Sequence, residues 1–157
     1  MRDVTLRPID GSDLDALFDQ MRDPESVQVA AFTAKDPDDR ETFDSRMVKS
    51  RTAPDATMRA VIRDGRLVGS IASFVVEGET EITYWIDRSV WGQGIASQAV
   101  ALFLDTVRVR PMYARAASDN VGSLKVLQGA GFRVIGTAIS YANARSSDIE
   151  ETVLRLD

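Results

Sequence analysis

A chain of 157 residues is long enough to bury a hydrophobic core, and we expect residues 1–157 to form a single domain. Its formal net charge of −5 argues against a nucleic-acid partner, which usually requires a basic surface, and suits a cationic substrate such as an amine. Because the sequence has no cysteine and no histidine, it excludes disulfides, thiol nucleophiles and Ser-His-Asp triads, and we expect no metal site.

The first half of the chain predicts strands and two helices. Residues 4–9 alternate in polarity as a strand does, and residues 11–23 carry apolar side chains at helical spacing. We expect Ser12 and Asp15 to form a capping box for this helix and Pro24 to end it. A second helix is expected over residues 36–51, because its Pro37 suits a first helical turn.

The remaining elements follow in a regular order. Asp64-Gly65 predicts a hairpin between two strands, and a third strand is expected over residues 80–86. A helix (94–109), a strand (112–117), a helix capped by Asp119 or Asn120 and two closing strands complete the chain. The order β-α-α-β-β-β-α-β-α-β-β predicts an α/β (α+β) fold: a mixed, mostly antiparallel sheet of about seven strands flanked by about four helices. The passage from residue 80 to residue 117 should connect two parallel strands.

The stretch WGQGIA, residues 91–96, places two glycines where a strand ends and a helix begins. The first turn of a helix has N–H groups without partners in the helix and the positive end of the dipole, and a phosphate can satisfy both. Glycine allows a tight turn and a close approach of the backbone to a ligand. A loop that needs glycine only in order to turn is the alternative, and these residues alone leave both open.

Two segments together resemble a known family. EITYWIDRSVWGQGIASQAV (81–100) and ARAASDNVGSLKVLQGAGF (114–132) resemble the two signature segments of the GNAT N-acetyltransferases. The resemblance is strongest to the branch that includes the Rim-type acetyltransferases of protein N-termini, and residues 4–18 also resemble the start of that branch. It implies a GNAT-like sheet in which the strand at residues 82–86 splays from the next parallel strand.

The resemblance also implies a cofactor site for acetyl-CoA. The family's phosphate loop, Arg/Gln-x-x-Gly-x-Gly/Ala, here reads Trp91-Gly92-Gln93-Gly94-Ile95-Ala96, with tryptophan in the first position. Main-chain amides of this loop are expected to hold the pyrophosphate. Backbone groups near Trp85 and Ile86 are expected to bond the pantetheine arm. Asn120, which also suits a helix cap, is expected to contact the cofactor.

Two residues are expected to carry the proton transfers. The family often has a glutamate at the position of Glu81, which implies a general base; a solvent-facing strand carboxylate is the alternative. The family's usual acid is a tyrosine seven residues after the asparagine, and that position here is Leu127. The Rim-like branch often has a serine at the position of Ser123, which becomes the expected proton donor, with packing at the helix start as its alternative role. Tyr141 is a further candidate.

The sequence therefore predicts an acetyl-CoA-dependent N-acetyltransferase that releases CoA. Its acceptor is expected to be a primary amine, on either a protein N-terminus or a small molecule. The alternative is an acyl-CoA-binding module without turnover; a dinucleotide oxidoreductase is disfavoured because a third glycine is missing. No apolar run approaches the ~20 residues of a membrane span, so we expect a cytoplasmic protein without a membrane partner. Because homodimers are common in the family, a homodimer is an open expectation.

Overall fold

The computed structural model describes residues 4–157. Seven strands, five α-helices and three 3₁₀ helices are found in this part of the chain. The strands are β1 (Val4–Pro8), β2 (Thr57–Arg63), β3 (Arg66–Val76), β4 (Glu79–Ile86), β5 (Met112–Ala117), β6 (Arg133–Ala142) and β7 (Ser147–Leu156). The helices are α1 (Leu14–Met21), α2 (Pro24–Ala30), α3 (Arg40–Thr52), α4 (Ile95–Thr106) and α5 (Val121–Gly129), with η1 (Gly11–Asp13), η2 (Arg88–Val90) and η3 (Asn143–Arg145).

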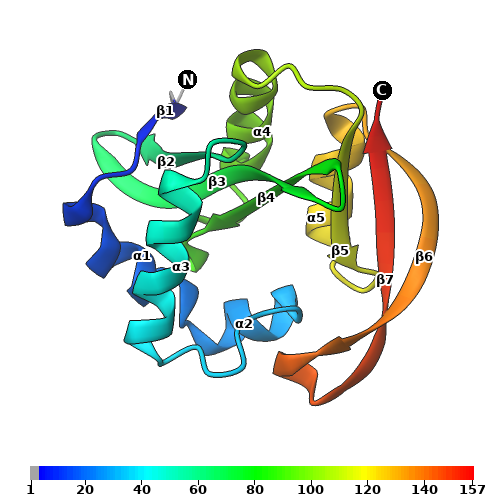
Figure 1. The fold of residues 1–157 in the computed structure, drawn as a ribbon, viewed down its shortest axis with the longest axis horizontal. Helices are drawn as coiled ribbons and strands as arrows, with labels where there is room; N and C mark the ends of the chain where they lie inside the picture. The colour runs from blue at the N-terminus through cyan, green and yellow to red at the C-terminus, as the bar shows by residue number, and fades with distance from the viewer. Residues whose placement is uncertain (1–3) are drawn as a thin grey trace.

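The strands form one sheet in the order β1-β2-β3-β4-β5-β7-β6 (Figure 1). Every neighbouring pair is antiparallel except β4 and β5, which are parallel. This confirms the predicted mixed, mostly antiparallel sheet and the parallel pair within it. The connection between the parallel strands contains α4, as such a connection requires.

Beyond the first two registered pairs, the parallel strands are not paired. Only Thr80 with Met112 and Glu81 with Tyr113 are in register, although β4 continues to Ile86. On its other side β4 stays paired with β3 along its whole length. The backbone of β4 therefore has an edge without a strand partner from Ile82 onward, which confirms the expected splay.

The N-terminal half differs from the prediction in its helices. Pro24 does not end a helix but begins α2, where its missing N–H costs nothing. The side chain of Asp23 accepts a hydrogen bond from the Ser26 N–H and caps this extra helix. Three helices, rather than two, therefore separate β1 from β2.

The predicted starts of two helices are also wrong. The capping box is formed by Asp10 and Asp13 around η1, whereas α1 has no side-chain cap, so the expected pair of Ser12 and Asp15 is incorrect. The helix expected at residue 36 begins at Arg40, because Asp39 accepts a hydrogen bond from the Thr42 N–H and serves as its N-cap.

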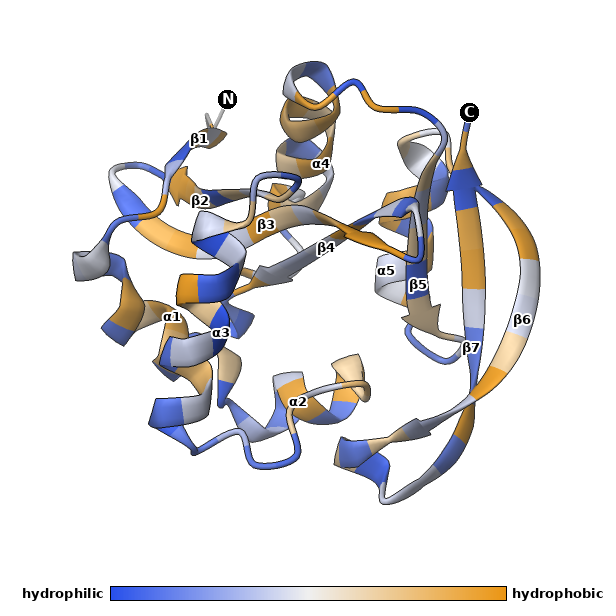
Figure 2. Cartoon of the chain, in the orientation of Figure 1, coloured by the Kyte–Doolittle hydropathy of each residue, from blue (hydrophilic) through white to orange (hydrophobic). Residues whose placement is uncertain are grey.

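Two apolar layers pack against opposite faces of the sheet. Neighbouring residues of β2 show the division, since Val61 packs with α4 and α5 while Ala60 packs with α1 and α3. Along α4, apolar residues alternate with polar ones (Figure 2), and Ile95, Val100 and Phe103 of this helix are buried in the core. Helices on both faces thus hold the end of β4, where the strands part. Among residues 4–157, no helix combines the length and apolar composition needed to cross a membrane.

Candidate functional site

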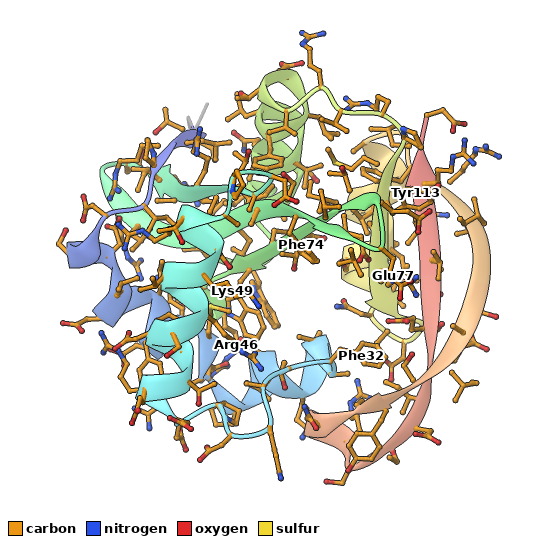
Figure 3. All side chains as sticks on the ribbon, in the orientation of Figure 1. Phe32, Arg46, Lys49, Phe74, Glu77 and Tyr113 are labelled. Carbon is orange, nitrogen blue, oxygen red and sulfur yellow. The ribbon has the colours of Figure 1, made fainter. Side chains whose placement is uncertain are left out.

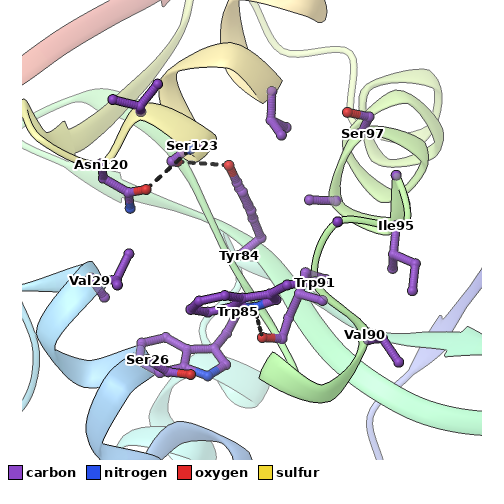
Figure 4. A pocket seen from close by; sticks show the side chains of 18 of the residues that line it. Ser26, Val29, Tyr84, Trp85, Val90, Trp91, Ile95, Ser97, Asn120 and Ser123 are labelled. Atoms are coloured by element: carbon purple, nitrogen blue, oxygen red, sulfur yellow. Dashed lines mark hydrogen bonds between the residues drawn. The ribbon is translucent and has the colours of Figure 1, made fainter.

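A cavity of about 580 Å³ opens where β4 and β5 part (Figure 4). Six segments contribute to its wall: α2, the end of β4, η2, the glycine loop (residues 91–94), the start of α4 and the start of α5. The lining residues are Ser26, Val29, Ala30, Tyr84, Trp85, Ile86, Val90, Trp91, Gly92, Gly94, Ile95, Ala96, Ser97, Asp119, Asn120, Val121, Gly122, Ser123 and Val126. This combination of an unpaired strand edge with two helix starts gives the cavity many backbone donors and acceptors.

The glycine loop brings the start of α4 to the cavity. Gly92 and Gly94 both have positive φ angles, 78° and 76°, which residues with a Cβ rarely adopt. Gly94 is the N-cap of α4 and offers no side-chain cap, so the first N–H groups of this helix are left for a ligand or water. The indole Nε1 of Trp91 donates to the Ile86 carbonyl oxygen at 2.8 Å, which fixes the loop to the end of β4.

Polar contacts hold α2 in place as the opposite wall. The Arg88 guanidinium of η2 donates from Nε to Asp23 Oδ2 at 2.7 Å, at the start of α2. This contact, aided by the Ser26 hydrogen bonds, lowers the pKa of Asp23 to about 2, so the pair stays ionised at neutral pH. The Trp85 indole Nε1 donates to the Gln20 carbonyl oxygen at 3.0 Å and ties β4 to α1.

The end of β4 also depends on a close backbone approach at Gly69 of β3. A Cβ on Gly69 would lie 2.1 Å from the Trp85 carbonyl oxygen, a distance that only glycine avoids. We expect Gly69→Ala to displace Trp85 and Ile86 and to destabilise the fold by about 1–3 kcal/mol in urea unfolding. Gly136→Ala is the control, because its methyl group would meet no atom within 4 Å. A wild-type unfolding free energy for Gly69→Ala would contradict the role of this contact.

A pair of hydroxyl groups lies on the α5 side of the cavity. The Oδ1 atom of Asn120 accepts a hydrogen bond from the Ser123 N–H at 3.2 Å, which confirms Asn120 as the cap of α5. The Ser123 hydroxyl lies 2.8 Å from the Tyr84 hydroxyl of β4 (Figure 4). Burial raises the pKa of Tyr84, and the hydrogen bond between Tyr84 and Ser123 opposes that shift only in part, so the phenol is neutral at neutral pH. Leu127 is buried in the core and offers no polar group.

The sequence analysis did not identify Tyr84. Its signal was present, because strand alternation places Tyr84 on the face of β4 opposite to Glu81 and Trp85. The first signature segment, residues 81–100, contains one tyrosine, Tyr84, whereas the family's usual tyrosine position holds a leucine here. The sequence does not show that Tyr84 and Ser123 are in contact, because 39 positions separate them.

Glu81 lies on the other face of β4, in a charged cluster. Arg115 of β5 donates from Nε to Glu81 Oε1 at 3.1 Å and from Nη1 to Glu151 Oε1 of β7 at 3.0 Å. The Glu81 side chain is 15% exposed and that of Glu151 is 10% exposed. Burial raises the pKa of Glu81; Arg115 opposes this shift, and the negative charges of Glu151 and Glu79 add to it. A carboxylate whose pKa is raised by burial is a candidate general base.

Most of the residues predicted to bind the cofactor line the cavity. Trp85, Ile86, Trp91, Gly92, Gly94, Ile95, Ala96 and Asn120 line it, together with Ser123. Gln93 does not line it, because its side chain accepts a hydrogen bond from Arg63. Glu81 is not a lining residue either, and Tyr141 lies exposed on β6, away from the cavity wall. Phe32 lies in the loop after α2 and Phe74 lies on β3, and neither lines the cavity (Figure 3).

Comparisons with known proteins agree with this geometry. A family model described as an acetyltransferase (GNAT) domain matches residues 3–133. YjcK of Bacillus subtilis (strain 168), a probable N-acetyltransferase, is 32% identical over 83 residues, which cover 48% of this chain and 46% of YjcK. The match with this curated relative thus spans about half of its length.

Two solved structures share the fold over nearly the whole chain. RimL, an alpha-N-protein acetyltransferase in complex with coenzyme A, has a TM-score of 0.78 at 20% identity, with 97% of this chain and 92% of RimL covered. RimJ of Mycobacterium smegmatis, in complex with a CoA-disulfide, has a TM-score of 0.80 at 23% identity, with 98% and 81% covered.

Proposed function

Because the chain belongs to the GNAT acetyltransferase family, we propose that it transfers the acetyl group of acetyl-CoA to a primary amine in the cavity between β4 and β5. The observation that carries the proposal is a single cavity that contains the unpaired edge of β4, the positive-φ glycine loop and the start of α4. Together these features suit the two ends of one elongated thioester: the loop and the start of α4 suit its pyrophosphate, and the edge of β4 suits its pantetheine arm.

The start of α4 suits the pyrophosphate. The uncapped N–H groups after Gly94 and the positive end of the helix dipole favour an anion there. The free edge of β4 near Trp85 and Ile86 suits the amide groups of the pantetheine arm, which then bond as a further strand would. A backbone N–H of this edge polarises the thioester carbonyl.

The proton transfers fall to groups on opposite faces of β4. The acceptor ammonium first loses a proton to Glu81, and the amine nitrogen then forms a bond to the carbonyl carbon. As the C–S bond breaks, its electron pair leaves with the sulfur, and the Ser123 hydroxyl stabilises this charge by a hydrogen bond. The nitrogen loses its second proton to solvent, Glu81 returns the first proton to solvent, and the sulfur takes one from solvent, so that the products are the amide, CoA and one proton.

The acceptor is proposed as a primary amine of a protein N-terminus or of a small molecule. The largely buried carboxylates Glu81 and Glu151 share one guanidinium, so the cluster carries a net negative charge that favours a cationic ammonium. An acyl-CoA-binding module without turnover is the alternative, and acceptor-dependent release of CoA excludes it. A cytoplasmic location, a homodimer and the extent of the domain stay predictions.

Calorimetric titration with acetyl-CoA and with CoA tests the cofactor site. We expect the wild type to bind both and Gly94→Trp to bind at least roughly tenfold more weakly, because the indole blocks the approach of backbone and diphosphate. Gly78→Trp is the matched control, since Gly78 has a similar φ of 80° but lies in the turn at the far end of β4. A wild type that binds neither compound would refute the proposed function.

A further inference from the structure

The hydroxyl groups of Tyr84 and Ser123 form a hydrogen bond in the wall of the cavity. Among residues 4–157, Tyr84 is the only tyrosine that lines the cavity, and its hydroxyl lies 2.8 Å from that of Ser123. The two groups come from β4 and α5, so the contact spans the cavity wall between a strand and a helix (Figure 4). At such a short distance one hydroxyl donates its hydrogen to the other.

Contacts with other residues fix the positions of both Tyr84 and Ser123. The ring of Tyr84 packs against the apolar core that also contains Leu127. The backbone of Ser123 is fixed by the hydrogen bond from its N–H to Asn120 Oδ1 at 3.2 Å. Because the phenol is mostly buried and stays neutral, Tyr84 keeps its hydrogen and is able to donate it at neutral pH.

On the basis of the proposed function, we propose that Tyr84 is a positioning residue that donates its O–H to Ser123 Oγ and thereby directs the Ser123 hydrogen toward the leaving sulfur. Without Tyr84, the Ser123 hydroxyl rotates freely or donates to a neighbouring acceptor. With it, the one hydrogen of Ser123 is available to the cavity.

The hydroxyl pair stabilises the leaving sulfur without giving up a proton. As the C–S bond breaks, its electron pair moves onto sulfur, and the Ser123 hydrogen bond stabilises the thiolate. Neither hydroxyl changes its protonation state, and the sulfur takes its proton from water. A hydrogen bond to a charged acceptor is stronger than one between neutral groups, so the pair stabilises the thiolate more than the intact thioester.

Titration of the bound CoA thiol tests this role without any acceptor. The absorbance of the thiolate is followed against pH for CoA bound to the wild type, Tyr84→Phe, Ser123→Ala and the double variant. We expect Tyr84→Phe to raise the pKa of the bound thiol by about half a unit, and Ser123→Ala by about one unit. The double variant should match Ser123→Ala, because Tyr84 acts only through Ser123.

Kinetics with hydroxylamine as a small amine acceptor provide a second readout. We expect Tyr84→Phe to lower kcat roughly threefold to tenfold, with the KM for acetyl-CoA within about twofold of the wild type. Thr52→Val is the control and should behave as the wild type, because it removes an exposed hydroxyl at the end of α3, away from the cavity.

The outcomes separate this inference from the proposed function. Wild-type titration and kinetics in Tyr84→Phe, or additive shifts in the double variant, would overturn the positioning role while acetyl transfer stands. A wild type that binds no CoA would refute the proposed function, and the positioning role with it.

Discussion

Replacement of Glu81 by glutamine is expected to lower kcat for acetyl transfer roughly 10²- to 10⁴-fold, the usual contribution of a general base. Glutamine keeps the size of the side chain but cannot take a proton from the acceptor ammonium. The measurement is the release of CoA with a primary amine acceptor, identified by a screen of peptides with free N-termini and of small amines. Acetyl-CoA binding should persist, because Glu81 does not line the cavity.

Glu150→Gln on β7 is the matched control for this substitution. Glu150 is an exposed carboxylate next in sequence to Glu151, and it takes no part in the Arg115 cluster. We expect it to leave kcat unchanged. Transfer by Glu81→Gln at the wild-type rate would assign the base to another group or to water.

Replacement of Arg115 by methionine is expected to move the acid limb of the pH–rate profile to higher pH. Burial already raises the pKa of Glu81, and the guanidinium is the positive charge that opposes this shift. Without it, Glu81 faces only the negative charges of Glu151 and Glu79, so its pKa rises further. Because the base acts when deprotonated, activity on the acid limb should fall roughly tenfold or more, while the rate at alkaline pH changes less.

Glu151→Gln should move the same limb in the opposite direction. This change removes a like charge and leaves Arg115 to Glu81 alone, so the pKa of Glu81 falls and activity persists to lower pH. The measurement is the profile of log kcat/KM against pH for Arg115→Met and Glu151→Gln, with Glu150→Gln as the control. Shifts of the same sign in Arg115→Met and Glu151→Gln would show that the acid limb does not belong to Glu81.

The sequence predicted the second half of the chain more accurately than the first. From residue 57 onward, a strong hairpin signal at Asp64-Gly65, clear alternation and the Asn120 cap specify each element locally. In the first half, several aspartates near prolines all suit helix caps, and sequence spacing does not decide which carboxylate reaches an N–H group. In the fold, the side chains of Asp10, Asp23 and Asp39 accept hydrogen bonds from backbone N–H groups and cap helices. The chain therefore has one helix more than predicted, and two helices begin later than predicted.

The sequence by itself determined which atoms are available: two glycines before α4, an asparagine cap, a glutamate on β4 and no histidine or cysteine. Only the tertiary structure decided their neighbours. Arg115 meets Glu81 across 34 positions because β4 and β5 are paired at Glu81 and Tyr113. Tyr84 meets Ser123 across 39 positions because the start of α5 lies beside β4, where the two strands part. A local pattern specifies a turn or a cap, since its partners lie within a few residues. The partners of a base or a hydroxyl come from other strands and helices, and packing of the whole sheet brings them together.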